Sequence, residues 1–350
     1  MLKERVSAAH ARIEERRIAM SDQSASKYRD TTAITVRAAE YPRDVERTVA
    51  IFNAWIMEPT TVERILEAEA RQVVGRHIHR LVALHGADEI IGYAEAIHSP
   101  WDAAGAYVGD LCVDVAWRGV GAGAALWSAL LASLRAADAQ RLEVSVRDDD
   151  AASWRFAEAR GFVRGRHIFE STLDLASFDE QPFAGAIARS QAAGYHFFTL
   201  ADVGDTEEAR RRDYEINRRV VFDIPGREQT FAPFEEWRRF VCEASWYRPD
   251  GQIIAALGAE WIGLAAVGYY AATNSMNNRI TGVDRAHRGQ GVAQALKLLA
   301  IRCARRYGAA YIRTNNDSEN APMLAINRKL GYQPQPGLYL YTLDLAAPER

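Results

Sequence analysis

Two glycine-rich segments of the chain have the residue types and the spacing to bind an anionic oxygen. The first, RGVGAG, runs from Arg118 to Gly123, and a similar segment, RGQGVA, runs from Arg288 to Ala293. Each leads from an apolar strand-like run into a helical pattern, so backbone N–H groups and the positive end of a helix dipole converge there. Glycine permits close approach and a positive φ, and the arginine adds charge. Both segments therefore predict phosphate binding.

Two classes of phosphate ligand compete for the first segment. GVGAGA satisfies the dinucleotide pattern G-x-G-x-x-A, and Glu143 follows where a ribose-binding acid would fall. The second segment reads GQGVAQ and lacks the third small residue. In both copies several strand patterns precede the turn, whereas a dinucleotide fingerprint normally follows the first strand of its unit. A nicotinamide-dependent oxidoreductase is therefore disfavoured, and Glu143 is interpreted as an ordinary residue of the strand RLEVSV.

The two segments belong to an internal duplication. WRGVGAGAAL begins at residue 117 and HRGQGVAQAL at residue 287, an offset of 170 positions. EARGF at 158 and RKLGY at 328 share that offset, as do the two occurrences of TLDLA at 172 and 342. Chance recurrence of common dipeptides would not hold one register over more than fifty residues. The duplication predicts two domains of the same architecture.

The elements that must position the turns recur in each copy. An opening strand (33–40; 195–202) is followed by an amphipathic helix (42–55; 206–220) and by two apolar strands divided by a turn. Another strand, the glycine-rich turn, a helix, a further strand, a short helix and a closing strand complete the unit. This order predicts an α+β fold: two tandem domains, each a mixed, mostly antiparallel sheet flanked by helices. We place an N-terminal extension at 1–31, domain 1 at 32–176, a linker at 177–192 and domain 2 at 193–346.

Composition excludes several classes of function. The chain has 350 residues, of which 48% are hydrophobic and 25% charged, and its formal net charge of −3 provides no basic footprint for nucleic acid. Three scattered cysteines form no CxxC pair, so we predict neither a disulfide framework nor a metal site. No uncharged apolar stretch reaches membrane-spanning length, and the N-terminus has no signal-peptide pattern. We expect a cytoplasmic protein without a membrane or nucleic-acid partner, as a monomer or homodimer.

Beyond the glycines, the two copies resemble the general N-acetyltransferase (GNAT) superfamily. Both match its pattern Arg-x-x-Gly-x-Gly/Ala, and LCVDVAWRGVG and TGVDRAHRGQG are similar to its central strand and turn. DAASWRFAEARGF and NAPMLAINRKLGY are similar to its second signature, a helix that ends at Gly-Phe or Gly-Tyr. The resemblance covers nearly the whole chain, once per half. The tandem arrangement resembles that of mycothiol synthase and related bacterial two-domain acetyltransferases.

This resemblance implies acetyl-CoA as the co-substrate, with its pyrophosphate on each turn and its pantetheine arm along the preceding strand. A polar residue that opens the signature helix touches the coenzyme in relatives, although helix capping explains such a residue nearly as well. Asn315 and Asn316 line the same groove or form a turn. The implied coenzyme-binding residues are Val113, Arg118, Gly119, Val120, Gly121, Ala122, Gly123 and Asp150 in the first half, and Val283, Arg288, Gly289, Gln290, Gly291, Val292, Ala293, Asn315 and Asn320 in the second.

Relatives often carry a tyrosine, which protonates the leaving thiolate, four residues before the glycine of the Gly-Phe signature. The chain departs from this pattern, because Ala157 and Asn327 occupy the two positions. Ala157 cannot donate a proton. Asn327 can donate a hydrogen bond but no proton, so Tyr332, water or the departing ammonium would have to serve. A coenzyme contact or a packing amide explains Asn327 equally well.

No general base stands out. Glu95 and Asp110 interrupt apolar strands of the first half, where a raised pKa would suit a base, although such residues more often face solvent or pair with arginine. The second half offers Glu215, Asp223 and Glu260. In relatives the acceptor is recognised between the first two helices. Here Asp223 and the aromatic residues Phe222, Phe231 and Trp237 lie in that segment, where packing under a loop is the alternative role.

The sequence thus predicts an acetyl-CoA-dependent N-acetyltransferase that acts on a primary amine of a small molecule or peptide by direct transfer through a ternary complex. The second half is favoured as catalytic because it is richer in groups able to contact the coenzyme, with Asn327, Tyr332 and Asp223 as its catalytic residues. The alternative is a CoA-binding regulatory or scaffold protein without catalysis. The acceptor, the acyl chain length and the oligomeric state stay open.

Overall fold

A computed structural model describes residues 34–56, 59–71, 73–224 and 230–346 of the chain. The predicted N-terminal extension at 1–31 lies outside these residues. The repeated unit is present twice, as predicted. The first copy comprises β1 (Ile34–Ala38), α2 (Val45–Asn53), α3 (Val62–Ala70), β2 (His77–His85), β3 (Glu89–His98), β4 (Ala106–Val113), α4 (Ala122–Ala136), β5 (Arg141–Arg147), α5 (Ala151–Glu158) and β6 (Val163–Asp174).

The second copy repeats this order. It comprises β7 (Tyr195–Thr199), α7 (Glu207–Val221), α8 (Phe234–Val241), β8 (Gln252–Leu257), β9 (Glu260–Tyr270), β10 (Ser275–Val283), α9 (Val292–Arg306), β11 (Tyr311–Asp317), α10 (Ala321–Lys329) and β12 (Gln333–Asp344). The predicted linker is not extended throughout, because it contains the short helix α6 (Ala186–Ala192), which packs against α9.

Local sequence explains where the helices begin. Thr206 caps α7 by accepting a hydrogen bond from the Ala209 amide at 3.2 Å, and acidic residues occupy the first turn while arginines occupy the last. Helix α4 begins at Gly121, and its apolar stripe of Leu126, Leu130 and Leu134 is at most 2% exposed. The stripe anchors α4 on the sheet, so the glycine-rich turn before it has a fixed place.

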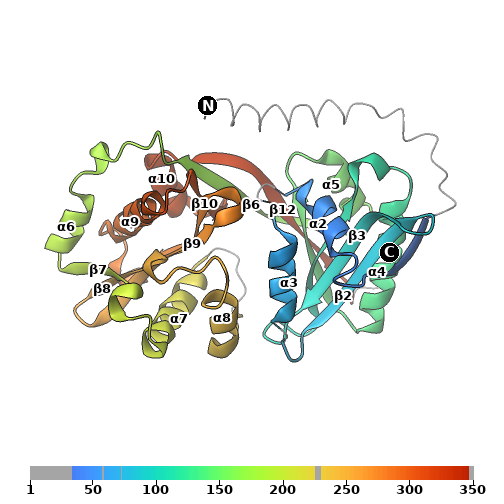
Figure 1. Cartoon of the computed structure of the whole chain (residues 1–350), viewed down its shortest axis with the longest axis horizontal. Coiled ribbons are helices and arrows are strands. Elements are labelled where there is room, and N and C mark those ends of the chain that lie inside the picture. The colour runs from blue at the N-terminus through green and yellow to red at the C-terminus, as the bar shows by residue number, and fades with distance from the viewer. Residues whose placement is uncertain (1–33, 57–58, 72, 225–229, 347–350) are drawn as a thin grey trace.

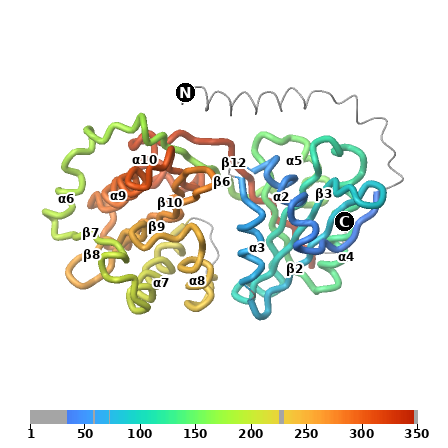
Figure 2. Tube along the Cα trace, viewed as in Figure 1, coloured from blue at the N-terminus to red at the C-terminus, as the bar shows by residue number. Residues whose placement is uncertain are grey.

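The two halves share one twelve-stranded sheet in the order β1-β2-β3-β4-β5-β12-β6-β11-β10-β9-β8-β7. The closing strands are exchanged: β12 pairs with β5 of the first half, and β6 pairs with β11 of the second. Figure 1 shows β6 and β12 crossing between the halves, and the same crossing is visible in the trace of Figure 2. Accordingly, Tyr341 of β12 belongs to the core of the first half and Leu173 of β6 to that of the second.

Most strand pairs are antiparallel, which confirms the predicted mixed sheet. The pairs β4–β5 and β10–β11 are parallel. Helix α4 packs against β1, β2, β3 and β4, α2 packs against β3 and β4, and α7 and α9 occupy corresponding positions in the second half. In Figure 1 the helices α2 and α3 stand on one half, α7 and α8 stand on the other, and β6 and β12 run between them.

Candidate active site

The first glycine-rich turn joins β4 to α4. Gly119 and Gly121 have φ values of +79° and +100°, a conformation that side chains with a Cβ rarely adopt. A Cβ built on Gly121 would meet no atom within 4 Å, so the turn faces open space. Gly121 is also the N-cap residue of α4, so it lies where the positive end of the helix dipole emerges. The structure thus provides the open cradle for an anion that the sequence predicts.

Asp150 ties the turn to α5. Its carboxylate accepts hydrogen bonds from the Ala152 and Ser153 amides and from Ser153 Oγ, as expected of an N-cap residue. It also binds Arg118 Nη1 at 3.0 Å. Burial opposes the charged form, but the contacts with Ser153 and Arg118 prevail and lower the pKa of Asp150. Asp150 therefore holds the N-terminal end of α5 beside the turn.

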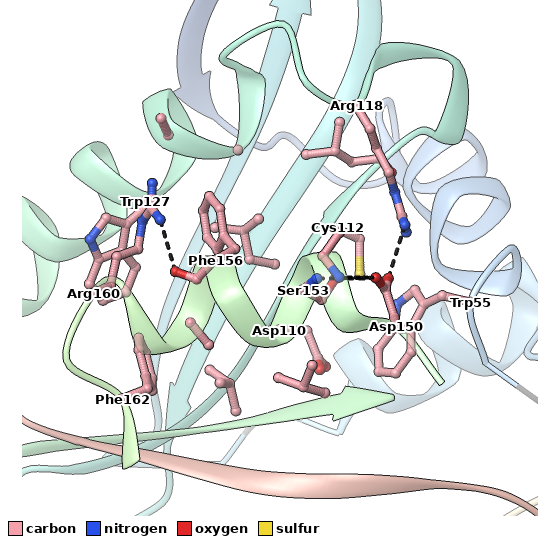
Figure 3. A pocket seen from close by; sticks show the side chains of 18 of the residues that line it. Trp55, Asp110, Cys112, Arg118, Trp127, Asp150, Ser153, Phe156, Arg160 and Phe162 are labelled. Atoms are coloured by element: carbon pink, nitrogen blue, oxygen red, sulfur yellow. Dashed lines mark hydrogen bonds and ion pairs between the residues drawn. The ribbon is translucent and has the colours of Figure 1, made fainter. Parts of the chain in front are cut away.

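Below the turn, β4 and β5 diverge. Their parallel pairing runs from Ala106 opposite Arg141 to Gly109 opposite Val144 and does not continue to the ends of the strands. A cavity of about 480 Å³ occupies the space between the diverging strands, α4 and α5. It reaches the turn at Arg118, Gly119, Gly121 and Gly123, and it is otherwise lined mostly by apolar side chains, among them Val113, Trp127, Leu130, Leu142, Val144, Phe156, Ala157 and Phe162. We call this cavity the first groove. Figure 3 shows it with Trp127 and Phe162 toward one end and Arg118, Asp150 and Trp55 toward the other.

One acid of the groove, Asp110, has the properties of a general base. It lies on β4, directly after the last residue that pairs with β5, and it lines the first groove. Burial, with the negative charge of Glu95 as a smaller cause, raises the pKa of Asp110 to about 7. Glu95 faces Asp110 across the β3–β4 pair and is bound by Arg80, which also pairs with Glu69 of α3. Asp110 is therefore an acid of the first groove that can accept a proton near neutral pH.

A second cavity, of about 910 Å³, lies between the two halves. It is lined from the first half by β4, β5 and β6 and from the second by β11 and β12, and Ile224 and Thr230 contribute from the loop after α7. Trp55 and Arg147 line both this inter-domain cavity and the first groove. Arg147 Nη1 donates a hydrogen bond to the Trp55 carbonyl at 2.8 Å, so the two residues form one wall. The cavities thus meet at a common boundary.

The second glycine-rich turn has the same backbone but different surroundings. Gly289 and Gly291 have φ values of +77° and +81°. The Asp223 carboxylate contacts both Arg285 and Arg288 at this turn. Partial burial opposes ionisation of Asp223, but the two arginines outweigh it and hold its pKa below the usual range. Asp223, a predicted catalytic residue, is therefore a charged partner of the turn with little capacity to accept a proton.

The space that forms the first groove is crossed by hydrogen bonds in the second half. Thr314 Oγ1 of β11 donates to the carbonyl of Asn278 on β10 at 2.9 Å. Asn327 of α10, which is 2% exposed, donates from Nδ2 to Asn316 Oδ1 at 2.6 Å. In the first half, the positions of Thr314, Asn316 and Asn327 are occupied by Val144, Val146 and Ala157. The side chains of these three residues cannot form such bonds. Asn327 thus forms the contact of a packing amide here, which is one of the three roles considered for it, beside a coenzyme contact and the predicted catalytic role.

Two further polar groups fill the second half at groove positions. Lys297 and Tyr332 correspond to Trp127 and Phe162, and they are 1% and 3% exposed. The Lys297 ammonium lies 5.0 Å from the centre of the Tyr332 ring, and within the described residues it forms no ion pair. Burial lowers the pKa of Lys297 to about 7 and raises that of Tyr332. A buried phenol of raised pKa holds its proton firmly, although Tyr332 is the predicted proton source.

The remaining predicted positions fall into four groups. Asn320 caps α10 by accepting from the Met323 amide at 3.4 Å, while Asn315 and Asn316 belong to β11 and line the inter-domain cavity. The acids Glu215 and Glu260 are exposed, and Glu215 pairs with Arg218 at 3.0 Å. Val283 is the last residue of β10. The other turn residues lie at the junctions with α4 and α9: Val120, Ala122, Gln290, Val292 and Ala293. Phe222, Phe231 and Trp237 pack in one aromatic cluster around Tyr214, the alternative role considered for them.

Comparisons with known proteins agree with this geometry. The model of the acetyltransferase (GNAT) family matches residues 47–162, which contain the first turn and groove. A tandem GNAT protein from the clavulanic acid biosynthesis pathway superposes with a TM-score of 0.70 at 19% identity, covering 90% of this chain and all of that one. The chain has the fold of a tandem GNAT protein. A GCN5-related N-acetyltransferase from Sphaerobacter thermophilus has the same fold, with a TM-score of 0.68 at 18% identity over 91% of this chain and 97% of that one.

Sequence relatives extend the comparison. The tandem GNAT protein is 29% identical to a mycothiol acetyltransferase of Saccharomonospora viridis over 74% of this chain and 81% of the relative. It is 26% identical to one of Beutenbergia cavernae over 74% of this chain and 82% of the relative. Together with the family model, these relatives identify it as an N-acetyltransferase. The family generally uses acetyl-CoA. Among the described residues, no helix has the length and apolar character needed to cross a bilayer.

Proposed function

We propose that the tandem GNAT protein transfers the acetyl group of acetyl-CoA directly to a primary amine of a small molecule, and that the thioester binds in the first groove. The observation that carries this proposal is the continuity of three features. An open anion cradle lies at one end of the groove, an apolar channel follows it, and a large cavity adjoins the channel at Trp55 and Arg147. A long ligand with a phosphate at one end and a reactive carbonyl at the other fits the cradle, the channel and the cavity in that order.

The residues of the first half fit the coenzyme in charge and in shape. The exposed turn and Arg118 suit the pyrophosphate, because helix N-termini and glycine-rich turns bind anions. The pantetheine arm suits the gap between β4 and β5, because from Asp110 to Val113 the backbone pairs with β3 on one side but not with β5 on the other, which leaves that edge open to the amides of the arm. Gly123 permits close passage, since a Cβ there would lie 3.3 Å from the Phe156 ring.

The chemistry requires one proton acceptor at the boundary between the cavities. When the amine nitrogen attacks the thioester carbonyl, a C–N bond forms and the C–S bond breaks. The amine proton passes to Asp110, directly or through water, and the thiolate takes up a proton as it leaves. A carboxylate with a pKa of about 7 is matched to this task at neutral pH. Ala157 cannot donate the proton to the thiolate, so we assign that role to water, and the proton held by Asp110 returns to solvent.

The inter-domain cavity is the proposed acceptor site. Its walls carry charges of both signs, and two ion pairs, Arg313 with Glu170 and Arg166 with Asp317, connect β11 to β6 inside it. Such a lining suits a polar small molecule rather than an apolar one. The relatives named mycothiol acetyltransferases support a small-molecule acceptor of that kind. The exchange of β6 and β12 means that both halves build this site.

The sequence favours the second half as catalytic, and that prediction remains untested. The contacts of the second half support a different role for it. Asp223 already neutralises the arginines of its turn, and Asn327, Asn316 and Thr314 bridge the elements that a coenzyme arm would have to separate. We therefore assign transfer to the first half and part of the acceptor cavity to the second.

Release of free CoA thiol from acetyl-CoA, measured over a panel of polar amines, tests the proposed function. We expect amine-dependent thiol release and an N-acetylated product by mass spectrometry. Tight binding of acetyl-CoA without release across the panel would instead support the CoA-binding regulatory protein that the sequence leaves as an alternative. Absence of binding would contradict both.

A further inference from the structure

The first groove extends past the point where its strands begin to pair. Leu142 lies opposite Tyr107 in the β4–β5 ladder, two residues below the last pair, Gly109 with Val144. Leu142 nevertheless lines the cavity, together with Leu130 of α4. The groove therefore has an inner lobe. This lobe lies deeper than the gap between β4 and β5, through which a pantetheine arm would reach the acceptor. We define this inner lobe by six lining residues: Trp127, Leu130, Leu142, Val144, Ala157 and Phe162.

The side chains of these six residues give the inner lobe an apolar lining. Trp127 and Phe162 meet edge to face, with ring centres 5.3 Å apart, and close the lobe on the side of α4. Leu130 and Leu142 form its floor and belong to the core cluster of the first half. The indole N–H of Trp127 is the one polar group among the six side chains. Such a space offers nothing to a phosphate or an amide but accepts hydrocarbon.

Ala157 determines how much room the lobe has. It lies on α5, is 5% exposed and contributes only a methyl group to the lining. In the second half the corresponding residue is Asn327, whose amide reaches Asn316 across the equivalent space. Three more of the six positions become polar there, with Lys297, Thr314 and Tyr332 in place of Trp127, Val144 and Phe162. An open, apolar inner lobe is thus a property of the first half.

We propose that the inner lobe is an acyl-chain site and that the first half binds short-chain acyl-CoA thioesters, propionyl to hexanoyl, more tightly than acetyl-CoA. Ala157 is the residue that sets the permitted chain length. This inference rests on the proposed function, because it places a thioester in the first groove. An acetyl group has a single methyl beyond the carbonyl and leaves the partly exposed side chains of Trp127 and Val144 uncovered, whereas a longer chain covers them.

Calorimetric titration with acetyl-, butyryl- and hexanoyl-CoA tests the inference without knowledge of the acceptor. Burial of one methylene strengthens binding roughly fourfold, so two methylenes predict a Kd for butyryl-CoA that is roughly 15-fold below that for acetyl-CoA. Ala157→Leu should abolish this difference, so that the Kd values for butyryl-CoA and acetyl-CoA become equal. Ala159→Leu, an equal enlargement at an exposed position of the same helix end, should keep the difference.

The outcomes separate this inference from the function on which it rests. Binding of acetyl-CoA with no gain for butyryl-CoA in the unmodified protein overturns the acyl-chain site and leaves the proposed function intact. Failure of all three thioesters to bind overturns both. If Ala157→Leu does not fold, the ratio of the Kd values in the unmodified protein still decides. A gain that persists unchanged in a folded Ala157→Leu protein contradicts the role of Ala157.

Discussion

The two halves of the chain have the same turn but differ in what lies beneath it. In the first half the space below the turn is an apolar groove that opens toward the inter-domain cavity. In the second half, polar side chains at the corresponding positions bind one another, and an ammonium is buried among them. The glycines that define the turn are retained at both sites with positive φ. The comparison teaches that a phosphate-binding turn identifies the fold of a half, whereas the side chains around the adjacent groove decide what that half can bind.

The exchange of closing strands predicts the largest effect, which is loss of independent folding. Residues 32–176 expressed by themselves would lack β12, which pairs with β5, and β11, which pairs with β6. Two long strand edges would be exposed, and such edges favour association. We expect no folded monomer from this fragment, as measured by circular dichroism and sedimentation. A monomeric fragment with a cooperative thermal transition would show that the halves are separable units.

Removal of the two candidate acids distinguishes the halves in activity. Asp110→Asn should lower kcat/KM for acetyl transfer by roughly 10²- to 10⁴-fold, because a positioned general base contributes about that much. Asp223→Asn should have a far smaller effect, because Asp223 is an ion-pair partner of arginines. The measurement is steady-state thiol release with both variants at one pH. The reverse order of effects would restore the second half as catalytic.

The pH dependence of the reaction sharpens the assignment of Asp110. The carboxyl is protonated and inactive as a base below its pKa of about 7, so kcat/KM should rise as the pH increases through that value. Glu95→Gln removes the negative charge opposite Asp110, one cause of the raised pKa, and should move the midpoint to lower pH. If the midpoint does not move in a Glu95→Gln variant of normal stability, Glu95 does not contribute to the raised pKa of Asp110.

The buried ammonium of the second half predicts a smaller effect, on stability. The pKa of Lys297 is lowered from 10.5 to about 7, so the unfolded chain binds this proton more readily than the folded protein between these values. The destabilisation caused by Lys297 is therefore greatest below pH 7, and it decreases as the pH approaches 10.5. Lys297→Met should raise Tm by roughly 5 °C at pH 7 and less at pH 10. A gain that is constant with pH would indicate that packing, rather than charge, is responsible.

Much of the fold follows from local sequence. The common offset of 170 positions, the Gly-Phe and Gly-Tyr signatures and the alternation of strand and helix patterns predict the repeated unit, and the structure confirms it. The capping roles of Asp150 and Asn320 are also local and are confirmed. The exchange of β6 and β12 is not local, because each closing strand pairs with a strand of the other half that lies far from it in the sequence. Only the assembled sheet decides which half it joins.

The candidate site is less predictable for the same reason. The raised pKa of Asp110 depends on its burial and on Glu95 in the adjacent strand, and neither is visible in the sequence around it. Trp127, Phe156 and Phe162 line the first groove but are not predicted from the sequence as site residues. Trp127 and Phe156 lie on the helices beside the turn and Phe162 follows the second of these helices, and these positions are the available signal. The wealth of polar groups in the second half favours it in the sequence, yet these groups bind one another.

A calorimetric titration with acetyl-CoA of the unmodified protein and of Gly121→Val and Gly291→Val tests the central claim most directly. The two glycines are a matched pair, because each is the N-cap of the helix after its turn and each has a positive φ that valine resists. We predict one coenzyme per chain, affinity reduced at least tenfold in Gly121→Val, and affinity retained in Gly291→Val. Two bound coenzymes, or loss of binding in Gly291→Val with binding kept in Gly121→Val, would contradict the assignment of acetyl-CoA to the first groove.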